Sequence, residues 1–356
     1  MKKIAFAIAV VLGVLFTSCG AKKNAAGWYT DFEAAKKAAN SKNKSILLFV
    51  HSDYDMDGSD AGVAALTGSS EFIKALNERY VCVLFSFTDL ETTMNGAGLD
   101  ATNAEQKAVE KRKKLLQEQF RVADIYAIQE TPSITLITKD GYYITSVSND
   151  FSGSSVDGYV GLVNAEDAAV RQMQAAVLAT EKGSASERIA AIDALFESST
   201  EMQRLALVDL SRKLVDLDKK NESGLVSKHL FSIANAESYE KLSSLDFVGA
   251  VKIYSRYAED KRILPVDSQA LYFMAASAMA RSGSSDVSAV IALLQKSIDV
   301  LPDGENVASI KTVMENLQNM QAMQTAMEEN SAPAAADDAA PDAGAAADEA
   351  TNAVVQ

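Results

Sequence analysis

The chain of 356 residues is short of cysteine, histidine, proline and glycine. Its only cysteines are Cys19 and Cys82, and its only histidines are His51 and His229. Two histidines alone do not make a zinc site, and at most one disulfide could form within the chain. Five prolines and 18 glycines leave few helix breakers, while Ala is abundant. We therefore expect a largely helical protein.

Positive charge is also scarce, because 34 Lys and Arg face 48 Asp and Glu, which gives a net charge of −14. This balance argues against nucleic acid as a partner and against an electrostatic hold on anionic lipid. The sequence also has no G-x-x-x-x-G-K-S/T, H-E-x-x-H or G-x-S-x-G motif. A hydrophobic fraction of 48% is ample for buried cores, and the length allows two or three domains.

Residues 1–18 have the features of a signal peptide. Two lysines precede the apolar run Ile4–Phe16, which is too short to span a bilayer comfortably, and Thr17 and Ser18 lead to Cys19. With Leu15 upstream, this stretch resembles a bacterial lipobox. The resemblance implies that Cys19 is acylated and becomes the first residue of the mature protein. The alternative is an ordinary secretory signal followed by an unmodified cysteine.

A lipid on Cys19 would make residues 19–27 an anchor linker and fix the protein to a membrane. By resemblance to other lipoproteins, Gly20 points to the periplasmic face of the outer membrane rather than the inner. If Cys19 is acylated, Cys82 has no partner within the chain, so no intramolecular disulfide forms.

The stretch Ile46–Asp60, ILLFVHSDYDMDGSD, resembles the strand and S-D-W-C-x-x-C turn of thioredoxin-like lipoproteins. Aligned on Ser52-Asp53, the Trp of the family falls on Tyr54, and its two cysteines fall on Asp55 and Gly58. Dithiol exchange needs a nucleophilic thiolate and a resolving thiol beside it. The resemblance therefore implies the fold without the redox activity.

The later stretch 122–147 resembles the second half of a thioredoxin. By this resemblance Thr131-Pro132 is the cis-proline bond that packs against the redox turn, and its surface would bind peptide. Ile134–Thr138 and Tyr142–Val147 would form an antiparallel hairpin around Asp140-Gly141. Together the two stretches predict an α/β thioredoxin-like domain over residues 28–163. Its other predicted elements are a helix over Trp28–Asn40 capped by Thr30 or Asp31 and strands over Ser45–Val50 and Tyr80–Phe87. Between these strands we expect a helix that ends near Leu66 and a second one over Ser70–Tyr80. An inserted loop over Leu90–Thr102 and a helix over Asn103–Phe120 follow.

Residues 164–329 carry only helix signals, so we expect an all-α domain. Residues 270–302 resemble one tetratricopeptide unit closed by Pro302; a generic helical bundle is the alternative, and in both cases the helices must stack. Residues 330–356 hold five acids and no base, and this Ala/Asp/Pro tail is expected to be disordered. Ser184 and Glu187 fit a capping box. The predicted helices are Glu166–Thr180, Glu187–Glu197, Thr200–Asp218, Leu225–Lys241, Phe247–Glu259, Ser268–Arg281, Val287–Val300 and Asn306–Glu328.

An acidic cluster offers the one candidate metal site. Asp53, Asp55 and Asp57, followed by Gly58, match the first half of an EF-hand loop, but the position of its bidentate Glu is Ala64. A weak Ca²⁺ site of roughly millimolar affinity is one interpretation. The other is that these carboxylates only favour the N-terminus of the following helix. No other cofactor is expected.

The sequence therefore suggests a membrane-anchored binding or scaffold protein rather than an enzyme. Its partner would be an envelope protein or peptide. One alternative is a redox-related protein that acts through Cys82 alone, although the apolar strand around Cys82 predicts a buried thiol. A hydrolytic site at His51 and the Asp cluster, and a weak calcium-binding structural role, are the others.

Overall fold

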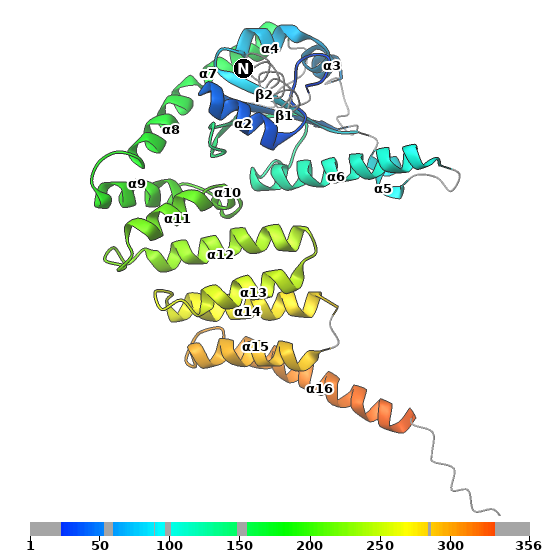
Figure 1. Cartoon of the computed structure of the whole chain (residues 1–356), viewed down its shortest axis with the longest axis vertical. Helices are drawn as coiled ribbons and strands as arrows, with labels where there is room; N and C mark the ends of the chain where they lie inside the picture. Colours follow the sequence, from blue (N-terminus) through cyan, green and yellow to red (C-terminus); the bar gives the residue numbers. More distant parts are fainter. Residues whose placement is uncertain are drawn as a thin grey trace, which may run out of the picture.

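The computed structural model describes residues 23–52, 60–88, 90–96, 101–147, 155–283 and 286–331. An α/β part with a small mixed sheet comes first, and many helices follow (Figure 1). The proposed signal peptide, Cys19 and the segment from Asp53 to Ser59 lie outside the described residues. The predictions for Asp53, Tyr54, Asp55, Asp57 and Gly58 therefore have no structural counterpart, and the same holds for residues 332–356.

The sheet has four strands in the order β2-β1-β3-β4. Strand β1 runs parallel to β2, whereas β3 is antiparallel to both β1 and β4. The predicted strands and the predicted hairpin are confirmed, and β2 has the predicted bounds. The strands are β1 (Ser45–Ser52), β2 (Tyr80–Phe87), β3 (Ser133–Ile137) and β4 (Tyr143–Val147).

Both faces of the sheet are covered by helices, which is why β1 and β2 are apolar almost throughout rather than alternating. Side chains of one parity, such as Leu47 and Cys82, pack with the helices on the first face. Side chains of the other parity, such as Ile46 and Val83, pack with those on the second face. The first face carries α3 (Asp60–Gly68), α4 (Ser70–Leu76) and α7 (Val156–Ala165), and the second carries α2 (Phe32–Lys42) and α6 (Asn103–Ile125).

The segment before α2 forms part of the sheet layer rather than the predicted start of the helix. Asp31 ends this segment, because its side chain accepts a hydrogen bond from the amide of Ala34 at 2.9 Å and caps α2. Trp28 is fully buried, with its ring between Phe49 and Phe72. The backbone of Tyr29 lies along β2: its amide donates to the carbonyl of Cys82 at 3.0 Å, and the amide of Leu84 donates back at 2.8 Å.

Two helices of the α/β part were not predicted. Helix α5 (Leu90–Asn95) lies inside the stretch Leu90–Thr102 that was expected to be a loop, so that prediction is wrong over this turn and a half. Leu90 packs against the second face of the sheet, and this contact fixes a segment whose sequence has no helical period. Helix α7 buries Tyr159 and Val163 completely against the first face.

The helical part is a stack in which successive helices pack side by side (Figure 1). Most predicted helices are confirmed to within a few residues, and Ser184 and Glu187 form the expected capping box. The predicted helix Thr200–Asp218 is wrong in one respect, because it is divided at the buried Leu207. The helices are α8 (Asp167–Ala179), α9 (Ala185–Glu197), α10 (Glu201–Ala206), α11 (Val208–Leu217), α12 (Val226–Ser243), α13 (Phe247–Ala258), α14 (Pro265–Arg281), α15 (Val287–Val300) and α16 (Val307–Ser331).

Tyr142, in the turn of the hairpin between β3 and β4, joins the two parts. Its side chain is buried in the first core of the helical part, together with Ile192 of α9 and Leu210 of α11. Thr138 stabilises this turn, since its hydroxyl accepts a hydrogen bond from the amide of Tyr142 at 2.9 Å. One aromatic side chain of the sheet therefore belongs to the core of the helices.

Candidate functional site

The carboxyl ends of the parallel strands β1 and β2 form one edge of the sheet, and polar side chains gather there. Ser52 is the last residue of β1 and is paired in register with Phe87, the last residue of β2. The earlier residues of β1 are buried, whereas His51 and Ser52 are only half-buried. Ligands of open α/β sheets bind outside the carboxyl ends of the strands. This edge is therefore the candidate site.

Thr131 and Pro132 lie at the same edge. The hydroxyl oxygens of Ser52 and Thr131 are 2.9 Å apart and share a hydrogen bond, although the two residues are 79 positions apart in the chain. The peptide bond between Thr131 and Pro132 is cis. Ser133 then starts β3 and pairs with Val50 of β1, which fixes the position of the bond relative to the sheet. The site thus presents hydroxyl groups beside a proline.

Helix α6 contributes two residues that the sequence analysis did not select. The ring of Phe120 stacks on the ring of Phe87 with centroids 4.3 Å apart, and 45% of Phe120 remains exposed. One guanidinium nitrogen of Arg112 donates to the carbonyl of Ser86 at 2.6 Å. Arg112 belongs to the basic cluster of residues 111–114, and its side chain reaches back to the sheet. An aromatic residue at helical spacing from the buried Leu116 was the only available signal for Phe120.

Cys82 of β2 lies away from this edge, on the first face of the sheet. Its side chain points into the core on the first face of the sheet and is buried. Burial disfavours the thiolate and raises the pKa of the Cys82 thiol to about 12, which the nearby Lys23 offsets only in part. At neutral pH the thiol is therefore protonated and shielded, as the apolar strand predicted.

His51, the other residue considered for chemistry, sits near the end of β1. Its ring stacks on that of Phe49, with centroids 6.1 Å apart and planes 18° from parallel. This packing orients the imidazole along the strand. Among the described residues, no group of three or more His, Cys, Asp or Glu side chains is arranged to hold a metal ion.

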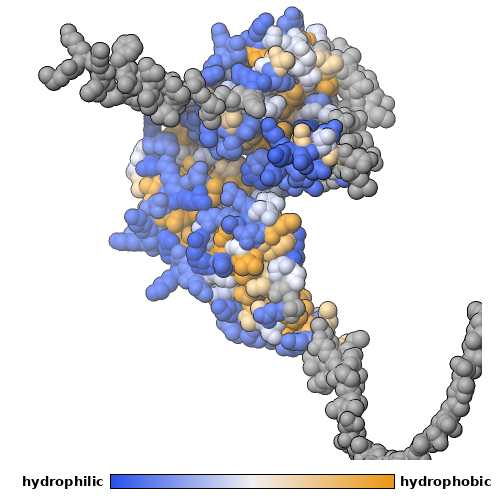
Figure 2. All heavy atoms as spheres, turned by 45° about the vertical axis from the view of Figure 1, so that its right-hand side comes forward, coloured by the Kyte–Doolittle hydropathy of each residue, from blue (hydrophilic) through white to orange (hydrophobic). Residues whose placement is uncertain are grey.

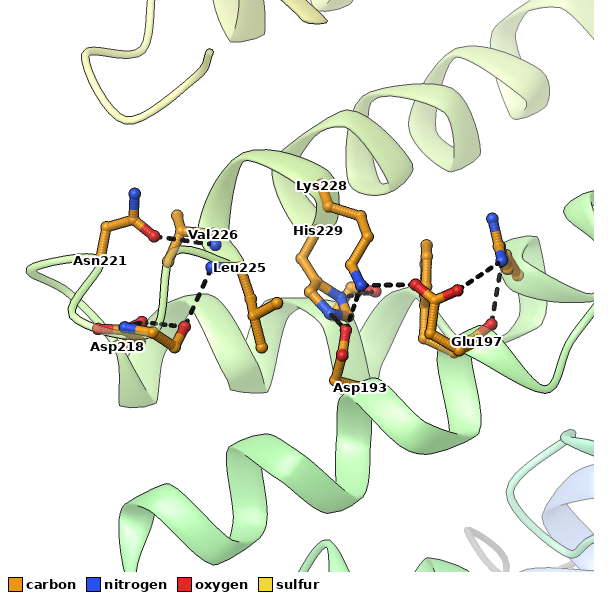
Figure 3. A network of polar contacts seen from close by, with 12 residues as sticks. Asp193, Glu197, Asp218, Asn221, Leu225, Val226, Lys228 and His229 are labelled. Carbon is orange, nitrogen blue, oxygen red and sulfur yellow. Dashed lines mark hydrogen bonds and ion pairs between the residues drawn. The ribbon is translucent and has the colours of Figure 1, made fainter.

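A second polar cluster lies inside the helical part, and Figure 3 shows its contacts. The imidazole of His229 on α12 contacts two groups: its Nδ1 lies 3.0 Å from the hydroxyl of Ser211 on α11, and its Nε2 lies 3.2 Å from a carboxylate oxygen of Asp193 on α9. Lys228 bridges Asp193 at 2.5 Å and Glu197 at 2.6 Å. Three helices are tied together in this way.

This arrangement has the residue types of a Ser-His-Asp triad, but not the access that catalysis needs. Ser211 and His229 are both fully buried, so no substrate carbonyl can approach the Ser211 hydroxyl. Burial lowers the pKa of His229 despite the attraction of Asp193, which keeps the ring neutral. We therefore interpret the cluster as a structural network.

Comparison with known proteins gives a family only for part of the chain. Residues 225–323 match the model of a family described as "Uncharacterised protein C-terminal domain". This range covers α12, α13, α14, α15 and the greater part of α16. It does not include the strand edge that carries Ser52 and Thr131.

One relative is an uncharacterised protein from Treponema pallidum (strain Nichols), which is 25% identical over 195 residues. The alignment covers 54% of this chain and 64% of the relative, so the chain spans somewhat less than two thirds of that protein's length. No solved structure matches the chain. Across the described ranges, no helix combines the length and the apolar character needed to cross a bilayer.

Proposed function

We propose that the protein is a lipid-anchored binding protein of the bacterial envelope. In this proposal a thioredoxin-like domain without a dithiol binds an extended peptide, and the helical domain offers a second protein-binding surface. The observation that carries the proposal is the composition of the strand edge. Hydroxyls of Ser52 and Thr131 and the ring of Phe120 are exposed or half-buried there, whereas the thiol of Cys82 is buried.

The order of elements supports the thioredoxin-like interpretation. A parallel pair, β1 and β2, is connected through helices, and an antiparallel hairpin and a closing helix, α7, follow. The cis peptide bond joins Pro132 to Thr131, and the hydroxyl of Thr131 contacts the hydroxyl of Ser52. Apart from α7, these are the elements that the sequence resemblance implied, in the same order.

A peptide ligand suits this edge for physical reasons. Hydroxyl groups both donate and accept hydrogen bonds, so Ser52 and Thr131 can satisfy the polar backbone of an extended segment. Phe120 adds an exposed aromatic surface, which is the kind of residue that anchors protein interfaces. An apolar side chain of the peptide would pack on this ring.

A photo-crosslinking experiment tests the proposal. A benzoylphenylalanine placed at Phe120 preserves an aromatic ring and should cross-link to a specific envelope protein on illumination. Thr131→Arg, which fills the edge with a long charged side chain, should abolish that product. The same crosslinker at Leu178 on α8, also exposed, is the matched control.

An insulin-reduction assay examines the competing redox function. We expect no turnover above the uncatalysed rate, since a single buried thiol cannot complete disulfide exchange. Turnover that disappears in Cys82→Ala would overturn the proposed binding function in favour of thiol chemistry.

A further inference from the structure

An uncharged groove lies at the far end of the helical stack, between α14 and α16. Its volume is about 270 Å³, and its lining includes Gln269, Phe273, Met274, Asn306, Ile310 and Val313. Phe273 and Val313 remain 38% and 41% exposed. Figure 2 shows hydrophobic surface over this helical part of the molecule, between areas of hydrophilic surface. No side chain that lines this groove carries a charge.

Helix α16 extends beyond the helix that covers it (Figure 1). Ile310, Met314 and Leu317 pack against α15, and the Gln321 amide donates to the hydroxyl of Ser288 near the start of α15 at 3.1 Å. Beyond this point α16 continues to Ser331. On another side of the helix, Met320 and Met323 are 65% and 67% exposed. These two residues are three positions apart, so they lie on adjacent turns of the same helix face and form one apolar strip.

The stretch of α16 that carries Met320 and Met323 is unusual in charge as well as in exposure. Residues 316–327 read NLQNMQAMQTAM and contain no charged residue, in a chain of which 23% is charged. Solvent-facing helix surfaces normally carry charges of both signs. Because neither this helix face nor the groove is charged, packing one against the other would desolvate no ion.

The helix cannot fill its own groove. Met320 and Met323 follow Val313 by seven and ten residues of one continuous helix. At a rise of about 1.5 Å per residue they lie roughly 10 and 15 Å further along its axis. A straight helix cannot fold back, so the strip of a molecule does not fill the groove of the same molecule. A second copy, which brings its own strip and groove, would cover both.

We propose that this end of the helical stack is the interface between two copies of the chain. Met320 and Met323 of each copy pack against Phe273 and Val313 of the other around a two-fold axis. Each copy contributes both a strip and a groove, so the surface is self-complementary and the assembly closes at two. The few side chains involved make the dimer a reversible one.

Sedimentation equilibrium tests the proposal on the chain from residue 19 onward, with Cys19→Ser to prevent acylation. We expect a monomer–dimer equilibrium at micromolar concentration. Met320→Glu with Met323→Glu should weaken the dimer at least about tenfold, because it places charge in the interface. Leu178→Glu, an equally apolar exposed position on α8, should leave the equilibrium unchanged. A monomer at every concentration, or a dimer that the double variant leaves intact, would overturn the proposal.

Cross-linking tests the geometry independently of any loss of stability. Cys82 is buried, so a single introduced cysteine is the reactive thiol in the Cys19→Ser background. A chain with Met320→Cys mixed with a chain with Phe273→Cys should give a heterodimer with a short bismaleimide, whereas Leu178→Cys in place of Phe273→Cys should not. If residues 332–356 or another protein fill the groove instead, neither mixture reacts and the proposal is wrong.

Discussion

The phenol of Tyr239 on α12 donates a hydrogen bond of 2.7 Å to a carboxylate oxygen of Asp124 in the last turn of α6. Burial, and to a smaller extent this hydrogen bond, raise the pKa of Tyr239, so the phenol stays protonated and can donate. The contact joins the helical stack to the α/β part at a second place, beside the burial of Tyr142 among α9 and α11. Two contacts on different elements restrict rotation of one part relative to the other.

Tyr142→Ala should lower the free energy of unfolding by about 3 kcal/mol, because it removes a buried ring from the core of the helices. Loss of this ring should also uncouple the two parts. Urea denaturation followed by circular dichroism and by the fluorescence of Trp28, which lies in the α/β part, should then give two separate transitions instead of one.

Tyr142→Phe is the matched control for this prediction, since it keeps the ring and removes only the hydroxyl. We expect coincident transitions and a change below about 1.5 kcal/mol. Coincident transitions in Tyr142→Ala as well would contradict the role of Tyr142 as the connection between the parts.

Stability should fall on mild acidification because of His229. Burial lowers the pKa of the folded-state imidazole below its ordinary value of 6.5, so the unfolded chain binds the proton more readily. This contribution is complete above pH 6.5 and is lost as the pH falls through the folded-state value. The free energy of unfolding, measured with urea at pH 7.5, 6.5 and 5.5, should decrease by at most about 1.4 kcal/mol per pH unit.

His229→Gln identifies the source of that pH dependence. The groups that face the ring are Asp193 and Glu197 of α9, Ser211 of α11 and Lys228 on its own helix. Hydrogen-bonding to Lys228 lowers the pKa of Glu197 below its ordinary range, so this carboxylate stays ionised above pH 5.5. The variant should therefore show a flatter profile above pH 5.5, and an unchanged slope would assign the effect to other groups.

Cys82 should be inert towards thiol reagents in the native protein. With the pKa of its thiol raised to about 12, the thiolate fraction at pH 8 is roughly one in ten thousand, and burial blocks access as well. Ellman's reagent should label Cys19→Ser protein only after guanidinium is added. Labelling of the folded protein at the rate of a free thiol would show that Cys82 is accessible.

Leu245→Gly should stabilise the protein by roughly 0.5–1 kcal/mol. Leu245 ends α12 with a φ of +60°, a conformation that costs an L-residue about 1 kcal/mol and glycine almost nothing. The amide of Asp246 still donates to the carbonyl of Lys241 at 2.8 Å, so the turn itself remains. Calorimetry should give a higher Tm for the glycine variant and no gain for Leu245→Ala, which keeps the strain.

The parts of the fold that the sequence predicted are those with strong local signals. The continuous apolar run of Tyr80–Phe87 defines a strand buried on both faces, and the structure has that strand with the same ends. Ser184 and Glu187 define the start of α9 through a capping box. In both cases the information lies within a few neighbouring residues.

The features that the sequence did not predict depend on contacts between distant segments. The division at Leu207 places that side chain in the core beside Tyr142, which belongs to another part of the chain. In the sequence, Phe120 is one more apolar position of a helix, and only the structure shows that its ring stacks on that of Phe87. The hydrogen bond between Ser52 and Thr131 was not predicted, since no local pattern in either segment refers to the other.

The short segment around Tyr29 has a consequence for solubility. A strand at the border of a sheet exposes amides and carbonyls that can recruit a strand of another molecule, and β2 is such a border strand. The backbone of Tyr29 already occupies the carbonyl of Cys82 and the amide of Leu84. A proteolytic cut that released the residues before α2 would uncover these groups and open a route to aggregation through strand exchange.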